Sequence, residues 1–221
     1  MQIISNVQKR ILILFGDVPD SGAFYLTGGT ALAEFYLKHR KSNDLDFFAT
    51  IEEVITPFSY NLEQALKKDG MAVARQRAVR SFVELRVDQK YESTIVHIAQ
   101  DTPFRFEQTK EFSQYPKLKV DSLVDIASNK LLALFGRAVL RDFIDVYFLI
   151  KKDFFTFEAL VEKAKLKDPG FDLYWLAVAF EKIKAFDKGA PDLLMTVEKI
   201  EFGDLLNFFD ERRKEIADKL K

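Results

Sequence analysis

The residues best suited to chemistry form an Asp-Leu-Asp triplet at positions 44–46. Side chains alternate across a strand, so Asp44 and Asp46 share one face while Leu45 points into the core. Two carboxylates this close repel each other unless a cation neutralises them. Mg²⁺ is the natural candidate because it binds carboxylate and phosphate oxygens together. The triplet therefore predicts a divalent-metal site at Asp44 and Asp46.

A pair of glycines lies upstream of the triplet, in Gly28-Gly29-Thr30. The pair follows a predicted strand at 24–26 and precedes a predicted helix at 31–38. Glycines let the backbone approach a ligand closely, and the free N–H groups of a first helical turn face an anion. Thr30 would cap the helix or touch a phosphate oxygen. Each motif alone is common, but a phosphate-binding turn beside a carboxylate pair indicates phosphoryl transfer with two metal ions.

Composition excludes several other kinds of site. The 221 residues contain no Cys and two His, which excludes disulfides, cysteine zinc sites, a cysteine nucleophile and a multi-histidine metal site. Lys+Arg 33 against Asp+Glu 34 gives a formal charge of −1, so only a local basic groove could attract nucleic acid. We see no secretory signal and no apolar run of the roughly 18–20 residues that a membrane helix needs, and expect a cytoplasmic protein.

Hydrophobic periodicity predicts a mixed α/β half followed by an all-helical half, with a boundary near 118–122. We assign 1–120 to an α/β core and 121–221 to a helical domain. The core is predicted to hold helices at 2–16, 31–38 and from Pro57 to 68, strands at 24–26 and 44–48, and a three-stranded antiparallel meander within 71–101 with turns at 80–81 and 88–89. An irregular connection is expected between Pro103 and Pro116. Helices are predicted from an N-cap at Ser122 and around 139–151, 157–166, 171–187, 190–199 and 203–219.

With these motifs in order, the sequence resembles the DNA polymerase beta-like nucleotidyltransferase superfamily. It is more closely similar to the AbiEii/AbiGii toxin family of bacterial nucleotidyltransferases. The similarity spans about residues 23–150 and rests on three blocks, namely 28–32 with His39, Arg40, Ser42 and 44–48, then 122–131, then Arg137 with 141–147. The resemblance implies an α+β fold in which an N-terminal mixed-sheet nucleotidyltransferase core precedes a C-terminal helical bundle.

The resemblance also implies a role for each matched residue. Gly28, Gly29 and Thr30 would hold a nucleoside triphosphate, and Arg40 and Ser42 would support the phosphates or the turn. Asp44 and Asp46 would be catalytic and would bind Mg²⁺ or Mn²⁺. The helical half would contribute catalytic Lys130, as a cation near the phosphates or a proton-handling group, together with catalytic Asp142 and the nucleotide-binding residues Arg141 and Asp145.

The charged residues of the helical half can also be interpreted without the family resemblance. Arg137 and Arg141 are four apart and Asp142 and Asp145 are three apart, so each pair is expected to share a helix face. Taken alone, these charges predict an ion-paired helix surface. Lys130 lies in an otherwise apolar stretch, where it would either extend to water or meet a charge partner.

One position departs from the superfamily pattern. Active members place a third carboxylate on a later strand, and here that position falls on His97. His97 could sit in the site as a metal ligand or as a general base. Alternatively, Glu84 or Asp101 supplies the carboxylate, or the site has lost activity. His39 is expected to fix the turn before the Asp pair.

The leading prediction is a Mg²⁺-dependent nucleotidyltransferase that moves a nucleoside monophosphate from a triphosphate to an acceptor hydroxyl. The resemblance implies an RNA acceptor, such as a tRNA 3′ end, and a toxin of a toxin–antitoxin or phage-defence pair with a cognate antitoxin. A protein or a small molecule is the alternative acceptor. His97 also favours a non-catalytic nucleotide- or partner-binding module, and an accidental motif match would leave a generic α+β interaction protein.

Overall fold

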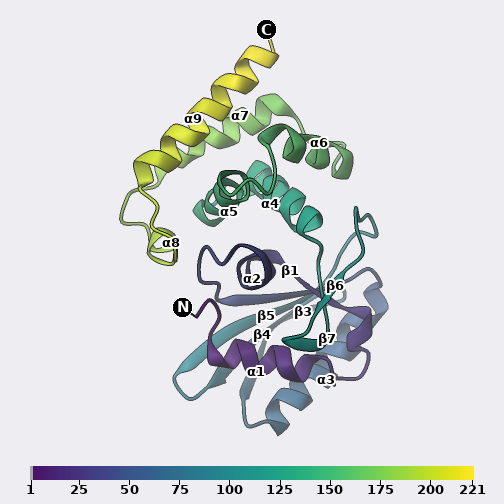
Figure 1. Ribbon diagram of the computed structural model, residues 1–221. Helices are drawn as coiled ribbons and strands as arrows, with labels where there is room; N and C mark the ends of the chain where they lie inside the picture. Colours follow the sequence, from purple (N-terminus) through teal and green to yellow (C-terminus); the bar gives the residue numbers. More distant parts are fainter. Residues whose placement is uncertain (1) are drawn as a thin grey trace. The chain divides into compact units, whose positions relative to one another are not determined.

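The computed structural model describes residues 2–221 and has the expected α+β fold. The chain forms two compact units, Met1–Leu123 and Val124–Lys221. The first unit contains all seven strands of the described residues, and the second is helical (Figure 1).

The first unit is built on one mixed sheet with the strand order β3-β4-β5-β2-β1-β7-β6. Neighbouring strands are parallel in the β2–β5 and β1–β7 pairs and antiparallel in the others. The strands are β1 (Tyr25–Thr27), β2 (Asp44–Ala49), β3 (Ala72–Val79), β4 (Phe82–Gln89), β5 (Glu92–Gln100), β6 (Lys110–Phe112) and β7 (Tyr115–Val120).

Two amphipathic helices cover one face of this sheet. These are α1 (Asn6–Phe15), which begins with a capping box between Ser5 and Gln8, and α3 (Ile55–Lys68). Phe15 stacks on Phe47 of β2 at 3.9 Å between ring centroids, and Phe24 stacks on Phe58 of α3 at 4.0 Å. These four rings are fully buried. Leu45 and Phe47 point into this layer, so the alternating pattern of β2 turns Asp44 and Asp46 to the opposite face.

The helix after the glycines starts earlier than predicted. It begins at Gly28 as α2 (Gly28–Ala31) and continues as a π-helical stretch, Leu32–Leu37. Lys38 ends it with φ +54°, a left-handed conformation that glycine more often adopts. Figure 1 shows α2 on the opposite side of the sheet from α1 and α3, and thus on the side to which Asp44 and Asp46 point.

The three-stranded meander within 71–101 is confirmed as β3, β4 and β5. Its second turn lies at Lys90 and Tyr91 and not at 88–89, because β4 continues to Gln89. The expected irregular connection between Pro103 and Pro116 is wrong, since β6 and the start of β7 lie there. Both strands are short and charge-rich, and Lys117 breaks the strand alternation with φ +66°, so period-2 patterning does not reveal them.

The second unit contains α4 (Leu123–Arg137), α5 (Leu140–Lys151), α6 (Phe157–Lys167), α7 (Leu173–Glu181), α8 (Pro191–Leu194) and α9 (Phe202–Lys219). The helix expected at 171–187 divides into α7 and a 3-10 turn at Lys182–Ala185. The helix expected at 190–199 is only the four residues of α8. Among residues 2–221, none of the helices combines the length and the apolar character needed to cross a membrane.

Candidate functional site

The first glycine of the pair lies directly against the second aspartate of the triplet. Gly28 has φ +72°, and a Cβ at this position would lie 2.2 Å from Asp46 Oδ2. No side chain fits there without displacing the carboxylate. The register of the sheet explains the contact, because Thr27 at the end of β1 pairs with Asp46 on β2. The structure therefore brings the glycine turn and the carboxylate motif together.

The second glycine makes an equivalent close approach to the next two predicted residues. A Cβ on Gly29 would lie 2.6 Å from Arg40 Nη2 and 3.3 Å from Ser42 Oγ. Arg40 is buried, and its Nη1 donates a hydrogen bond to the carbonyl of Lys41 at 2.9 Å. A buried guanidinium beside a glycine backbone is a suitable partner for phosphate oxygens.

Thr30 takes a different position from the one its sequence context suggests. Its side chain is fully buried, and its hydroxyl donates to the carbonyl oxygen of Asp44. The hydroxyl therefore ties the first helical turn to the start of β2. Any contribution of Thr30 to phosphate binding would come from its backbone. His39 is also fully buried in the turn before the triplet.

An acid that the sequence analysis does not single out anchors the end of β1. Asp121 is 1% exposed, accepts a hydrogen bond from Thr27 Oγ1 at 2.7 Å and pairs with Arg105. It thereby fixes the residue immediately before Gly28. In the sequence, Asp121 lies between a strand and a helix and looks like an ordinary helix N-cap. Only its burial in the structure shows that it has another role.

Asp46, His97 and Glu84 form a row across three neighbouring strands. In the sheet register, Asp46 pairs with His97 on β5, and His97 pairs with Glu84 on β4. Nδ1 of His97 lies 2.8 Å from Asp46 Oδ1, and Nε2 lies 3.3 Å from Glu84 Oε2. All three side chains are about one-quarter exposed. Asp101 is absent from this row and accepts a hydrogen bond from Tyr25.

The carboxylates around His97 control its charge. The hydrogen bond to Asp46 raises the pKa of His97, burial opposes the rise, and the charges of Asp46, Asp44 and Glu84 support it. A protonated ring donates a hydrogen bond to Asp46 from Nδ1, lies within ion-pair distance of Glu84 at Nε2, and neutralises part of the row. Both nitrogens thus already face carboxylates, which leaves the ring poorly placed to act as a general base in this arrangement.

The carboxylate pair suits a metal ion that takes only one or two of its ligands from the protein. No group of three or more His, Asp or Glu side chains within residues 2–221 is arranged to hold a metal ion. Mg²⁺, however, is ordinarily held by one or two carboxylates together with substrate phosphates and water. Asp44 and Asp46, on one face beside the glycine turn, match that donor set.

Three of the charged residues predicted in the helical half, Lys130, Asp142 and Asp145, form a buried ion cluster within the second unit. Lys130 Nζ lies 2.7 Å from Asp145 Oδ2 and 3.8 Å from Asp142 Oδ1. Asp142 also accepts two hydrogen bonds from Arg137, at 2.7 and 2.9 Å. Both aspartates are fully buried and Lys130 is nearly so, so this is no ion-paired surface. Their catalytic and nucleotide-binding roles stay predictions.

The expectation that Arg137 and Arg141 share a helix face is wrong. Arg137 is the last residue of α4, and Arg141 lies in the first turn of α5. Ala138, with φ +48°, separates the two helices. Arg141 instead approaches Asp192, with 3.7 Å between its Nε and Oδ1.

Solved structures show the same fold over nearly the whole chain. JHP933 from Helicobacter pylori is 20% identical, with a TM-score of 0.55 over 97% of this chain and 90% of its own. A putative nucleotidyltransferase from H. pylori is 20% identical, with a TM-score of 0.56 over 97% and 93%. MenT4, the nucleotidyltransferase toxin Rv2826c from Mycobacterium tuberculosis H37Rv, is 17% identical, with a TM-score of 0.56 over 96% and 82%. The fold is that of nucleotidyltransferase toxins.

The sequence assigns the family within that class. Residues 12–215 match the family described as nucleotidyl transferase AbiEii toxin, type IV toxin–antitoxin system, and the chain belongs to this family of nucleotidyltransferases. The uncharacterized protein aq_aa25 of Aquifex aeolicus (strain VF5) is 27% identical over 199 residues, which cover 87% of each chain. The family resemblance expected from the three motif blocks is thereby confirmed.

Proposed function

We propose that this nucleotidyltransferase moves a nucleoside monophosphate from a nucleoside triphosphate to an RNA hydroxyl, with Mg²⁺ or Mn²⁺ as cofactor. One observation carries the proposal: the glycine turn contacts the motif residues that a triphosphate site requires. Gly28 contacts Asp46, and Gly29 contacts Arg40 and Ser42. These contacts bring a backbone surface, a guanidinium and a carboxylate pair to one place in the first unit.

The proposed reaction is an in-line displacement. The oxygen of the acceptor hydroxyl bonds to the α-phosphorus and its proton passes to water, while the bond from that phosphorus to the bridging oxygen breaks and pyrophosphate leaves with the electron pair. The backbone of Gly28 and Gly29 and the guanidinium of Arg40 bind the triphosphate. His97 holds the Asp46 carboxylate from the neighbouring strand and is itself paired with Glu84 on the strand beyond.

Asp44 and Asp46 would hold the metal, which when bound stabilises negative charge on the attacking and leaving oxygens. Their shared face on β2 is fixed before ligand arrives, because Thr30 bonds the carbonyl of Asp44 and Gly28 contacts the carboxylate of Asp46. This rigidity keeps the two carboxylates from separating despite their mutual repulsion.

A transfer assay tests the proposal directly. The purified protein is incubated with Mg²⁺ or Mn²⁺, each α-labelled nucleoside triphosphate and total bacterial tRNA, with Asp46→Asn as the control. We expect label in RNA with the wild type and none with the variant. Label on protein or on a small molecule would replace RNA with that acceptor. Absence of label under every condition, with triphosphate binding intact, would refute transfer and favour a binding role.

We also propose that the protein acts as the toxin of a toxin–antitoxin pair with a cognate antitoxin, with its reaction in the cytoplasm, where triphosphates and tRNA are available. Family membership supports this role. Induced expression of the wild type should arrest growth, and Asp46→Asn, expressed to the same level, should not. Equal arrest by both proteins would show that toxicity does not depend on the proposed site.

A further inference from the structure

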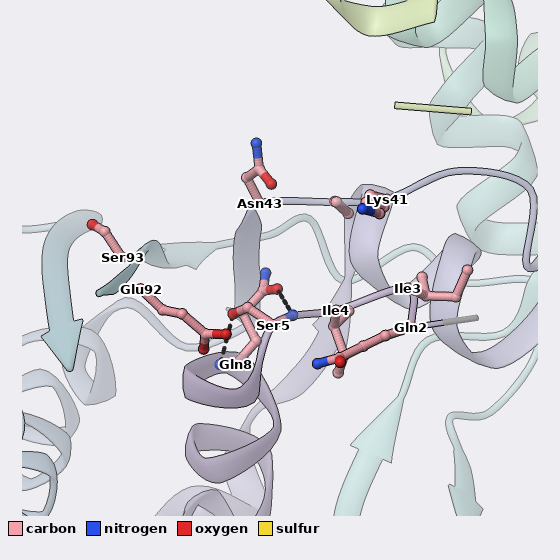
Figure 2. A pocket seen from close by; sticks show the side chains of 10 residues that line it. Gln2, Ile3, Ile4, Ser5, Gln8, Lys41, Asn43, Glu92 and Ser93 are labelled. Atoms are coloured by element: carbon pink, nitrogen blue, oxygen red, sulfur yellow. Dashed lines mark hydrogen bonds between the residues drawn. The ribbon is translucent and has the colours of Figure 1, made fainter. Parts of the chain in front are cut away.

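A polar hollow lies near the candidate site in the first unit. Its volume is ≈ 270 Å³, and it opens where α1, β2 and β5 begin. Polar side chains from three segments line it, among them Gln8, Lys41, Ser42, Asn43, Glu92 and Ser93. Figure 2 shows Gln8 reaching from α1 toward the start of β2, with Glu92 and Ser93 on one flank.

Gln8 presents a buried hydrogen-bond donor with no partner. Its Oε1 accepts a hydrogen bond from the Ser5 backbone at 2.9 Å, which fixes the orientation of the amide. Its Nε2 is buried and has no partner among residues 2–221, and the residue is 1% exposed. A buried donor left unsatisfied is costly, so this one indicates a ligand atom that accepts a hydrogen bond.

The charges of the hollow favour an uncharged polar ligand. Glu92 already accepts hydrogen bonds from Val7 N and Asn6 Nδ2, each at 2.9 Å, and Lys41 contributes one positive charge to the same lining. A free phosphate would meet the Glu92 carboxylate. A flat ring with carbonyl and amino groups would instead find donors and acceptors together, against the buried apolar side chains of Ile3 and Ile4.

The hollow approaches the glycine turn at Ser42, the lining residue next to Gly29. Ser42 lines the hollow, and its Oγ lies 3.3 Å from the Cβ position of Gly29. Asn43 also lines it and is three residues before Asp46, which is about 10 Å along a strand. That is the scale of one nucleotide.

We propose that this hollow binds the base of a nucleotide that reacts at Asp46, with Gln8 Nε2 donating to a carbonyl or ring nitrogen of the base. The inference rests on the proposed function and identifies a base-specificity residue for it. The base could belong to the incoming triphosphate or to the terminal nucleotide of the acceptor, and binding experiments separate these two sources.

Gln8→Glu is the informative variant. Glutamate preserves the capping box, because its carboxylate still accepts from the Ser5 backbone, but it replaces the buried donor with an acceptor. Gln64→Glu makes the same charge change on an exposed position of α3 and serves as the control. Ser93→Tyr is a second variant that narrows the hollow from an exposed rim position and leaves Gln8 in place. Thermal unfolding verifies that all three remain folded.

Calorimetry with Mg²⁺ measures binding of the α,β-methylene analogue of each nucleoside triphosphate and of base-free ribose 5-triphosphate. If the hollow takes the base of the triphosphate, Gln8→Glu and Ser93→Tyr should weaken the preferred analogue about tenfold or more, with the base-free compound unchanged. If it takes the acceptor base, the same loss should appear with a trinucleotide RNA and not with its 3′-terminal abasic version.

Unchanged affinities in both variants, within twofold for every ligand, would overturn the base site while leaving the proposed transferase intact. Equal loss for the base-bearing and base-free ligands would also overturn it, because the effect would then lie on the phosphates. Failure of the wild type to bind any triphosphate would instead overturn the proposed function and the base site together.

Discussion

Replacing Gly28 with alanine tests whether the glycine turn and the Asp46 carboxylate form one site. Alanine at φ +72° pays about 1–2 kcal/mol for the left-handed backbone. Its Cβ would also lie 2.2 Å from Asp46 Oδ2, so the carboxylate must move away from His97. Weakening that charged hydrogen bond costs roughly 1.5–3 kcal/mol, toward the lower end because the pair is partly exposed. We expect Gly28→Ala to lower the free energy of unfolding by about 2.5–4 kcal/mol and to abolish transfer.

Gly70→Ala is the matched control. Gly70 has φ +81°, but no atom lies within 4 Å of its Cβ position, so only the backbone cost of about 1–2 kcal/mol applies. Chemical denaturation of the two variants and the wild type gives the difference in their costs, which isolates the contact with Asp46. The same cycle is repeated in an Asp46→Ala background. There the carboxylate is gone and only the Cβ of residue 46 remains, 3.3 Å from the Cβ position of Gly28, so the cost of Gly28→Ala should fall most of the way to that of Gly70→Ala.

The reasoning fails if Gly28→Ala costs no more than Gly70→Ala and retains transfer activity. It also fails if the extra cost persists in the Asp46→Ala background, since the clash would then involve another group. Loss of transfer in both glycine variants at once would indicate a general loss of structure.

Three further predictions concern single side chains. In metal-free buffer, the raised pKa of His97 means that the Asp46–His97–Glu84 row stabilises the fold fully below about pH 6.5, and that this stabilisation is lost as pH rises through the higher folded-state pKa. The difference in free energy of unfolding between wild type and His97→Gln, measured by chemical denaturation, should therefore shrink as pH rises. A difference that does not depend on pH would contradict the row. Lys130→Met should destabilise the protein by about 3 kcal/mol, because it removes the ammonium group that pairs with buried Asp145. Lys151→Met, at an exposed position of α5, should change the free energy of unfolding by less than about 0.5 kcal/mol. Equal effects of the two substitutions in a urea titration would refute the buried pair. Thr30→Val should cost about 1–3 kcal/mol by leaving the carbonyl at the start of β2 without its hydroxyl donor, and a neutral result in the same titration would show that the hydrogen bond is dispensable.

Local sequence features were sufficient to predict the central part of the fold. Strand alternation placed Asp44 and Asp46 on one face of β2 and defined the meander, because both patterns depend on neighbours two residues apart. The same reasoning missed β6 and β7, whose pairing depends on a partner strand and on an irregular backbone at Lys117.

Helix periodicity had a similar limit. It predicted α4 and α5 but placed Arg137 and Arg141 on one face, because a residue such as Ala138 with positive φ is invisible to a spacing rule. It also predicted a helix at 190–199 where α8 has only four residues, because the helical spacing of apolar side chains continues beyond the point at which the backbone leaves the helix.

The sequence by itself determined the chemical content of the candidate site: a glycine pair, a carboxylate pair, and a histidine at the position where a third acid is expected. Only the tertiary structure decided how they meet. The pairing of β1 with β2 put Gly28 against Asp46, and the pairing of β4 and β5 put Glu84 on the far side of His97. These contacts join residues far apart in the chain, and strand register, which no local pattern encodes, determines them.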